Sequence, residues 1–446
     1  MKDPLPILPF RGPARGAVAL PGSKSLTNRA LVLAALAEGT TTLEGVLFSR
    51  DTELMLAALE RLGLALSADR EARTITVQGR GGHWPVREAS FDVGNAGTAA
   101  RFLTALLALA PEGRYALDGD PAMRERPMAE LLDALTAQGA RFTFGKQPGH
   151  FPFRLESSGL AGGAVTIDAG ASSQFVSALL LAAPCARADL VLRVEQLRPA
   201  FVRITTEMMS HFGARVGDSP EGMLTVGAGA GYQSPGTYAV EPDVTAASYF
   251  LALPLVTGGA VRLPGLTPNL LQGDAAFADV VAALGAEVKQ SAHGWEVGAP
   301  GGTPLPGLER DFRHFSDTFL TLAALAPLAE GPTTIRGIGH TRHQETDRVA
   351  AMARELAKLG CTVTEREDSL HIEPDRAALM RAVETTVEIE TYEDHRFAMS
   401  FAILGCADLR PDHGPWLRLR DPLCCRKTFP DFFTTLESLR GSRPAP

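Results

Sequence analysis

The chain has 446 residues, 45% of them hydrophobic and 21% charged, and this length predicts two or more domains with buried cores. Its net charge of -8 and its pI near 5.8 argue against a nucleic-acid platform, whose surface is normally basic. Five cysteines without a CxxC spacing favour a reducing cytosol, and no stretch reaches the ~20 apolar residues of a membrane span, so we expect a cytoplasmic protein without a membrane partner.

An apolar helix is expected to begin near Lys24, because eight apolar residues, Ala30 to Ala37, follow a polar start. A helix this apolar is usually buried on most sides, so its polar start is not ordinary surface. Cations are disfavoured at the positive end of the helix dipole unless an anion lies between them. Ser25 and Arg29 are four residues apart and share one helical face. We therefore predict that Lys24, Ser25 and Arg29 bind an anionic ligand.

The same pattern returns along the chain with a period of about 74 residues. Helix-like segments end at five regularly spaced glycines, which are Gly63, Gly139, Gly213, Gly285 and Gly360. In each copy an apolar helix leads into a strand, and in the first five copies a more amphipathic helix and short strands follow. Six α/β units that cannot bury their faces alone predict an α/β protein with two domains of three units.

Polar residues begin each apolar helix. Ser, Thr, Asn and Asp are common N-caps there, and this explanation is sufficient for Thr245. In the second half, Asp317 and Glu345 are candidates for a paired acid and base. The surrounding basic residues are candidate anion ligands, namely Arg348, His395, Arg396 and Lys427. His340 and His343 lack an HExxH pattern and a third ligand, so no metal site is expected.

Eight ordered segments, spread over about residues 10 to 433, resemble the 5-enolpyruvylshikimate-3-phosphate synthase (3-phosphoshikimate 1-carboxyvinyltransferase) family of enolpyruvyl transferases. They are LPGSKSLTNRALVLAALAEG, GNAGTAARF, DPAMRERPM, GASSQFVSALLLAAP, SDTFLTLAALA, ETDR, YEDHRFAMSFA and KTFPDFF. The resemblance implies two domains, each of three βαβαββ-type repeats, in an inside-out α/β barrel. It places an N-terminal domain at 21–242 and a C-terminal domain at 1–20 plus 243–446, with the active site in the interdomain cleft.

The resemblance also implies a reaction. The enolpyruvyl group of phosphoenolpyruvate would pass to the 5-hydroxyl of shikimate 3-phosphate with release of phosphate, a step of the shikimate pathway toward chorismate and the aromatic amino acids. Asp317 would take the hydroxyl proton, and Glu345, with Lys24, would protonate the methylene carbon. The resemblance implies neither a metal nor an organic cofactor, and we expect a monomer.

The family's ligand residues carry over to positions in both domains. Shikimate 3-phosphate, on the N-terminal side, would be bound by Lys24, Ser25, Arg29, Ser172, Ser173, Gln174 and Asp317. Phosphoenolpyruvate and the catalytic carboxylates would belong to the C-terminal domain. The phosphoenolpyruvate ligands would be Lys24, Gly97, Arg126, Gln174, Arg348, His395, Arg396 and Lys427.

The chain departs from the family's common residues at three places. Gln344 stands where a Lys is common, and His340 where an Asn is common. Phe201 is nearest the usual Tyr beside the sugar phosphate, with Arg198 or Arg203 as a source of positive charge.

Two alternatives remain at this point. One is a UDP-N-acetylglucosamine enolpyruvyl transferase, whose reactive loop usually carries a Cys where Asp120 or Pro121 stands here. The other is a non-catalytic anion-binding descendant, which Gln344 motivates and which the presence of both Asp317 and Glu345 opposes.

Overall fold

The chain forms two compact units, which a computed structural model describes over residues 2–197, 199–218, 222–302 and 304–440. Unit 1 is Met1–Pro21 together with Pro242–Pro446, and unit 2 is Gly22–Glu241. The two segments that pass between the units are hydrogen-bonded to each other. The Ser23 amide donates to the Glu241 carbonyl at 2.9 Å, and the Asp243 amide donates to the Pro21 carbonyl at 2.8 Å.

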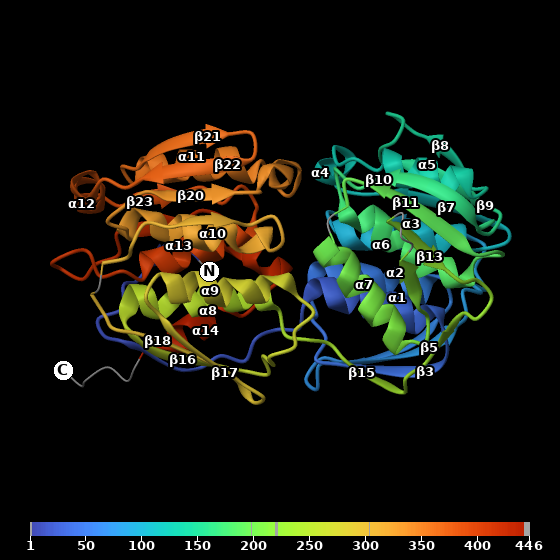
Figure 1. The fold of residues 1–446 in the computed structure, drawn as a ribbon, viewed down its shortest axis with the longest axis horizontal. Coiled ribbons are helices and arrows are strands. Elements are labelled where there is room, and N and C mark those ends of the chain that lie inside the picture. Colours follow the sequence, from blue (N-terminus) through green and yellow to red (C-terminus); the bar gives the residue numbers. More distant parts are fainter. Residues whose placement is uncertain (1, 198, 219–221, 303, 441–446) are drawn as a thin grey trace. The chain divides into compact units, whose positions relative to one another are not determined.

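Three apolar helices form the centre of unit 2, and three more amphipathic helices accompany them (Figure 1). Every residue of the first central helix from Leu26 to Leu36 is buried, as expected for a helix that is apolar around its whole circumference. The central helices are α1 (Lys24–Leu36), α3 (Gly97–Ala108) and α6 (Ser173–Ala182). The amphipathic helices are α2 (Arg50–Arg61), α5 (Ala129–Ala137) and α7 (Pro199–His211), and a short α4 (Pro121–Arg124) precedes α5.

Each repeat of unit 2 adds one sheet with the same arrangement. Counted across the sheet, the first two strands are parallel to each other. The third strand is antiparallel to the second, and the fourth is antiparallel to the third. The first sheet takes its parallel strands from the end of the unit, because β14 (Tyr232–Gln233) and β15 (Thr237–Ala239) pair with β3 (Ala37–Glu44). The other strands are β4 (Ala65–Asp69), β5 (Thr74–Arg80), β6 (Glu88–Asp92), β7 (Gly113–Asp118), β8 (Arg141–Phe144), β9 (Phe153–Ser157), β10 (Gly163–Asp168), β11 (Leu190–Glu195), β12 (Val216–Asp218) and β13 (Met223–Val226).

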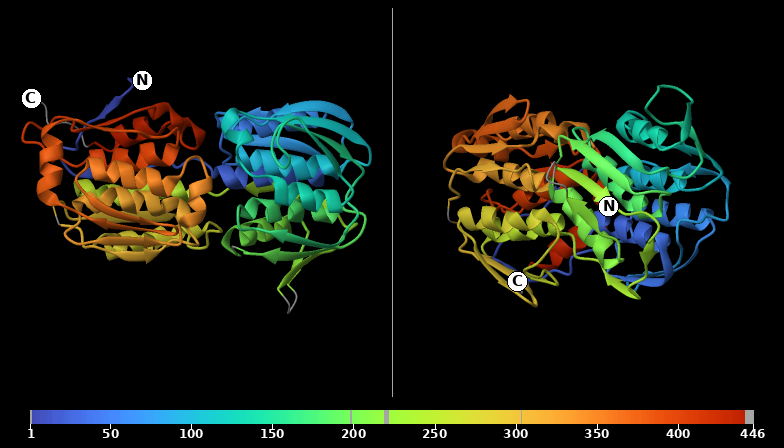
Figure 2. Two further views of the ribbon diagram at one scale, coloured as in Figure 1. Left: turned by 90° about the horizontal axis from the view of Figure 1, so that it is seen from above. Right: turned by 45° about the vertical axis from the view of Figure 1, so that its right-hand side comes forward.

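Unit 1 repeats this plan with its own three apolar helices, and both views of Figure 2 show helices lying inside flanking sheets. The central helices are α8 (Val244–Thr257), α10 (Phe319–Leu325) and α13 (His395–Gly405). The others are α9 (Phe277–Ala283), α11 (Arg348–Lys358), α12 (Arg376–Glu384) and α14 (Phe432–Ser438). The 3-10 turns that carry site residues are η2 (Gly273–Ala276), η3 (Ser316–Thr318), η5 (Gly339–His343) and η6 (Pro422–Lys427).

The N-terminal segment completes two sheets of unit 1. β1 (Leu5–Ile7) lies antiparallel to β24, and β2 (Ala14–Ala17) lies parallel to β16. The strands from the second half of the chain are β16 (Gly259–Pro264), β17 (Glu287–Ser291), β18 (Gly294–Ala299), β19 (Glu309–Asp311), β20 (Thr333–Arg336), β21 (Thr362–Arg366), β22 (Ser369–Glu373), β23 (Val387–Ile389) and β24 (Leu417–Leu419). The α/β class and the architecture of two domains with three repeats are thus confirmed. Across the described ranges, no helix is both long and apolar enough to cross a bilayer.

The N-terminal segment also contributes to the core of unit 1, which leads to a stability prediction. Phe10 is only 5% exposed and lies under the Arg440 guanidinium, 4.1 Å from the ring centroid. We expect Phe10→Ala to lower the free energy of unfolding of unit 1 by about 3–5 kcal/mol through the cavity it leaves. Denaturant unfolding followed by hydrogen exchange in unit 1 measures this loss. Leu8→Ala is the matched control, because Leu8 is 46% exposed and its loss should change the value by about 0.5 kcal/mol or less.

Candidate active site

Lys24 begins helix α1 and forms an ion pair that the sequence did not reveal. Its Nζ lies 2.9 Å from Oδ2 of Asp51, which stands in the first turn of α2 and is almost wholly buried. The carboxylate therefore fixes the ammonium group at the positive end of α1, while part of the lysine side chain stays exposed. An acidic residue in a first helical turn is commonplace, so no sequence signal distinguished Asp51.

Arg29 is a buried cation whose neighbours are neutral. Its side chain is 2% exposed; Nε donates to the Thr205 hydroxyl at 2.8 Å, and Nη1 donates to the hydroxyl and carbonyl of Ser25. The predicted proximity of Ser25 and Arg29 is therefore confirmed. Burial lowers the pKa of Arg29 to about 10, and no carboxylate forms an ion pair with it within the described ranges. A buried cation of this kind is stabilised by a bound anion.

Gly97 leaves space for two guanidinium groups at the start of α3. A Cβ on Gly97 would lie 2.5 Å from Nη1 of Arg101 and 3.0 Å from the Arg126 guanidinium. Arg126 donates to the Asn95 side chain at 3.4 Å, whereas its neighbour Arg124 is bound to Asp118. Sequence reasoning missed Arg101, although an arginine within an apolar, buried helix was a usable signal.

Helix α6 contributes hydroxyl and amide groups. Ser172 caps the helix and accepts a hydrogen bond from the Gln174 amide at 3.2 Å, and Ser173 is its first residue. The Gln174 side chain donates to the Thr98 hydroxyl of α3 at 3.3 Å. Together these groups make the basic cluster of unit 2, which comprises Lys24, Ser25, Arg29, Gly97, Arg101, Arg126, Ser172, Ser173 and Gln174. Three helix N-termini with basic side chains and hydroxyls suit a ligand with several negative charges.

Arg348 holds together a second cluster, in unit 1, which contains three carboxylates. It begins helix α11, is 1% exposed, and its Nε lies 2.6 Å from Oδ2 of Asp394. Its Nη1 donates to Asp317 at 3.1 Å and its Nη2 donates to Glu345 at 2.9 Å. Burial would lower the pKa of Arg348, but Asp394 and Glu345 raise it further, so the guanidinium is permanently charged.

Asp317 accepts hydrogen bonds from two arginines. Besides Arg348, Arg396 donates to its Oδ2 at 2.9 Å from the first turn of α13. Burial alone would raise the pKa of Asp317, but Arg396 and Arg348 outweigh it and hold the pKa below its usual value. The side chain is therefore ionised at neutral pH and can accept a proton.

Glu345 lies between two cations. Its Oε2 accepts from Arg348 and its Oε1 accepts from Nζ of Lys427 at 2.9 Å. Gln344 accepts a short hydrogen bond from Arg348 through Oε1. We define the acidic cluster of unit 1 as Asp317, Glu345, Arg348, Asp394, His395, Arg396 and Lys427.

An unusual turn presents Asp394, His395 and Arg396. Tyr392 and Glu393 both have left-handed backbone angles, with φ of 56° and 55°, which non-glycine residues rarely adopt. The turn is anchored by Glu355 of α11, a buried carboxylate that accepts from the Tyr392 hydroxyl at 2.7 Å and from the Glu390 amide at 3.1 Å. Asp394 then caps α13 by accepting from the Arg396 amide at 2.9 Å. His395 is buried, with Nδ1 3.7 Å from Asp394.

Other sequence expectations have mixed outcomes. The expected role of Thr245 as a cap is wrong, because Asp243 caps α8 and accepts from the Ala246 amide at 3.0 Å. His340 forms a hydrogen bond of 2.8 Å with the Ser316 hydroxyl, next to Asp317. Arg198 lies outside the described residues.

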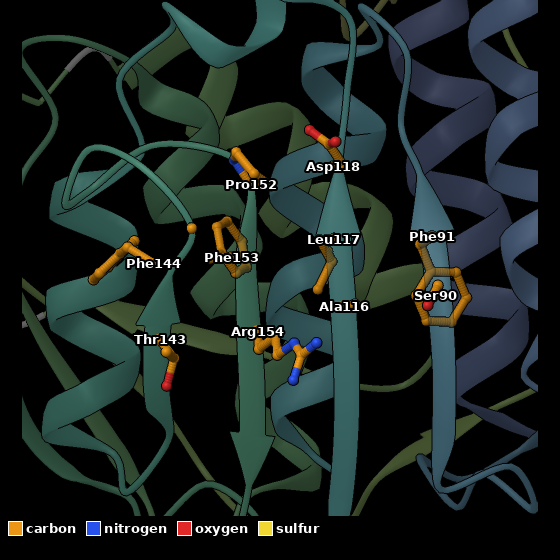
Figure 3. A pocket seen from close by; sticks show the side chains of 11 residues that line it. Ser90, Phe91, Ala116, Leu117, Asp118, Thr143, Phe144, Pro152, Phe153 and Arg154 are labelled. Carbon is orange, nitrogen blue, oxygen red and sulfur yellow. The ribbon is translucent and has the colours of Figure 1, made fainter.

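A hollow of about 560 Å³ lies on the sheet of β6, β7, β8 and β9, and it contains none of the predicted site residues. Figure 3 shows that Phe144, Phe153 and Arg154 line it from neighbouring strands of this sheet. The chemistry-bearing side chains of unit 2 instead gather at helix starts.

Comparison with known proteins gives consistent matches along the whole chain. A family model described as EPSP synthase (3-phosphoshikimate 1-carboxyvinyltransferase) matches residues 10–436. A 3-phosphoshikimate 1-carboxyvinyltransferase of Opitutus terrae is 52% identical, covering 99% of this chain and 98% of the relative, and one of Nostoc punctiforme is 42% identical, covering 97% and 98%. An EPSP synthase structure from Acinetobacter baumannii is similar with a TM-score of 0.79 and 25% identity, covering 98% of both chains.

The anchored turn before α13 generates a stability prediction. Glu355→Ala removes the acceptor of three hydrogen bonds, from Tyr392, Glu390 and Lys358. We expect the free energy of unfolding to fall by about 3 kcal/mol, measured by denaturant unfolding. Tyr392→Phe removes one of these bonds and should lower it by about 1 kcal/mol. Equal losses in both variants would contradict the anchoring role.

Proposed function

Since the chain belongs to the EPSP synthase family, we propose how its own side chains carry out that family's reaction. The enzyme transfers the enolpyruvyl group of phosphoenolpyruvate to the 5-hydroxyl of shikimate 3-phosphate and releases phosphate, within the shikimate pathway of aromatic amino acid biosynthesis. The roles of individual residues, including any joint action of the two units, are the proposal. A monomer and a cytoplasmic location stay predictions.

Shikimate 3-phosphate is assigned to the basic cluster. Arg29 supports this assignment, because a buried guanidinium with neutral neighbours favours a phosphate ligand. Ser25 shares its helical face, and Ser172 and Ser173 add hydroxyls at the N-terminus of α6. Lys24 also contacts this substrate, and Gln174 lies between the two substrates. Asp317 accepts a hydrogen bond from the 5-hydroxyl.

Phosphoenolpyruvate, which carries a carboxylate and a phosphate, is assigned to cations of both clusters. The ligands from unit 2 are Lys24, Gly97, Arg126 and Gln174, and those from unit 1 are Arg348, His395, Arg396 and Lys427. Gly97 contributes by its lack of a side chain, since a Cβ would displace the Arg101 and Arg126 guanidinium groups. These cations stabilise the negative charge that develops as phosphate leaves.

The chemistry proceeds by addition and elimination. Asp317 removes the proton of the 5-hydroxyl as the hydroxyl oxygen bonds to C2 of phosphoenolpyruvate. At the same time Glu345, with Lys24, delivers a proton to the methylene carbon C3. The product is a tetrahedral ketal phosphate. Glu345 then takes a proton back from C3, which re-forms the double bond as the C2–O bond to phosphate breaks, and the proton held by Asp317 passes to the leaving phosphate.

One observation carries this assignment of roles. Two carboxylates, Asp317 and Glu345, are bound to the two terminal nitrogens of one buried guanidinium, at 3.1 and 2.9 Å. A base and an acid are thereby held at a fixed spacing beside cations that can bind an anionic substrate.

The substrate assignment has a direct test. Phosphate release should require phosphoenolpyruvate with shikimate 3-phosphate and should be absent with phosphoenolpyruvate and UDP-N-acetylglucosamine. The loop before Arg126 supports this expectation, because Asp120 and Pro121 form the start of α4 and carry no thiol. Release only with the nucleotide sugar would overturn the assignment, and release with neither would favour the non-catalytic alternative.

The catalytic roles have a separate test. Glu345→Gln and Asp317→Asn retain shape and hydrogen-bonding capacity but cannot exchange the proton, so each should lower kcat by about 10²–10⁴-fold in the phosphate-release assay. Asp311→Asn is the matched control, since this carboxylate of the same unit forms an exposed ion pair with Arg313. A kcat within about twofold of the unmodified enzyme for either variant would remove that residue from the chemistry.

A further inference from the structure

A third carboxyl group lies beside Asp317 and has no place in the proposed chemistry. Asp274 belongs to the turn η2, two residues after Gln272. Gln272 fixes this turn to the start of α8, because its Nε2 donates to the Pro242 carbonyl at 2.7 Å and its Oε1 accepts from the Val244 amide at 3.2 Å. The position of Asp274 is therefore determined by the fold and not by a loose loop.

The carboxyl of Asp274 is buried and incompletely satisfied. The residue is 7% exposed, and within the described ranges its Oδ1 has no hydrogen-bond partner. The Thr245 hydroxyl of α8 is within hydrogen-bonding reach of the carboxyl. An unpartnered buried carboxylate oxygen is costly, whereas the protonated carboxyl is tolerated.

Three carboxyl groups, those of Asp274, Asp317 and Asp243, interact electrostatically with the guanidinium of Arg396. The charges of Asp317, Asp243 and Arg396 all influence the pKa of Asp274. Arg396 also interacts with the Tyr249 hydroxyl of α8. Burial, and then the charge of Asp317, raise the pKa of Asp274 to about 7. Asp274 therefore gains or loses its proton near neutral pH while Asp317 stays ionised, the separation expected when like charges share a site.

We propose that Asp274 is a positioning residue that couples phosphoenolpyruvate binding to the uptake of one proton. When Asp274 is protonated, Arg396 retains positive charge for the anionic substrate, and when Asp274 is ionised, it neutralises that charge and repels the substrate. The proton comes from solvent on binding and returns to solvent when phosphate and product leave. This inference rests on the proposed role of Arg396 as a phosphoenolpyruvate ligand.

The pH dependence of KM for phosphoenolpyruvate tests the coupling. Above pH 7 the free enzyme loses the Asp274 proton and must regain it on binding, so KM should rise by about tenfold between pH 7 and 8.5. Asp274→Asn mimics the neutral carboxyl at every pH and should abolish this rise, with kcat at pH 7 nearly unchanged. Ionisation of the substrate itself is common to both enzymes and cancels in the comparison.

Asp279→Asn is the matched control, because this carboxylate of α9 is five residues away and 75% exposed. It should keep the pH profile of the unmodified enzyme. Two results would overturn this inference alone, provided that the unmodified enzyme turns over. One is an Asp274→Asn variant with the same pH profile of KM as the unmodified enzyme. The other is a variant whose KM is raised by the same factor at every pH. Absence of turnover in the unmodified enzyme would instead count against the proposed function.

A second variant decides the question if Asp274→Asn does not fold. Thr245→Val removes the hydroxyl that favours the ionised carboxylate, so the rise in KM should move to higher pH. A rise at the same pH as in the unmodified enzyme would overturn the inference.

Discussion

The buried guanidinium of Arg348 is the interaction on which the acidic cluster depends. A cation that is 1% exposed needs close anionic partners, and it takes them from η3, from the segment before α11 and from the cap of α13. Two of these partners, Asp317 and Asp394, are 31 and 46 residues away along the chain, so η3 and the start of α13 must both be in place before the charge is satisfied. Removing Arg348 would leave several carboxylates together without their common counter-charge, so the residue has a structural role.

The two clusters differ in how their cations are neutralised. In the basic cluster, Lys24 is paired with Asp51, whereas the buried Arg29 is bound by hydroxyls and a carbonyl among the described residues. In the acidic cluster, the three carboxylates of Asp317, Glu345 and Asp394 are paired with three cations, which are Arg348, Arg396 and Lys427. The basic cluster is thus suited to binding an anion, and the paired carboxylates of the acidic cluster are suited to exchanging protons.

The sequence was most informative where one physical property repeats. Runs of apolar residues predicted all six central helices. The spacing of Ser25 and Arg29 predicted a contact that the structure contains. Partners across repeats were not predictable, because Asp51 and Asp274 stand in segments typical of a helix start and a turn. Thr245 shows the same difficulty, since a residue read as a local cap is instead a neighbour of a distant carboxyl. Local patterns reveal burial and helix ends, whereas tertiary contacts decide which charges meet.

The pairing of β1 with β24 has a consequence for the order in which the protein folds. Leu5 lies opposite Leu419, so unit 1 joins the two extremes of the chain, whereas unit 2 is one continuous segment inserted between its parts. During synthesis, unit 2 can collapse as soon as it has left the ribosome, while strand β1 must wait for a partner made more than 400 residues later. Contacts of such long sequence separation form slowly. Until then strand β1 stays unpaired, and the last repeat completes both unit 1 and its cluster of charges.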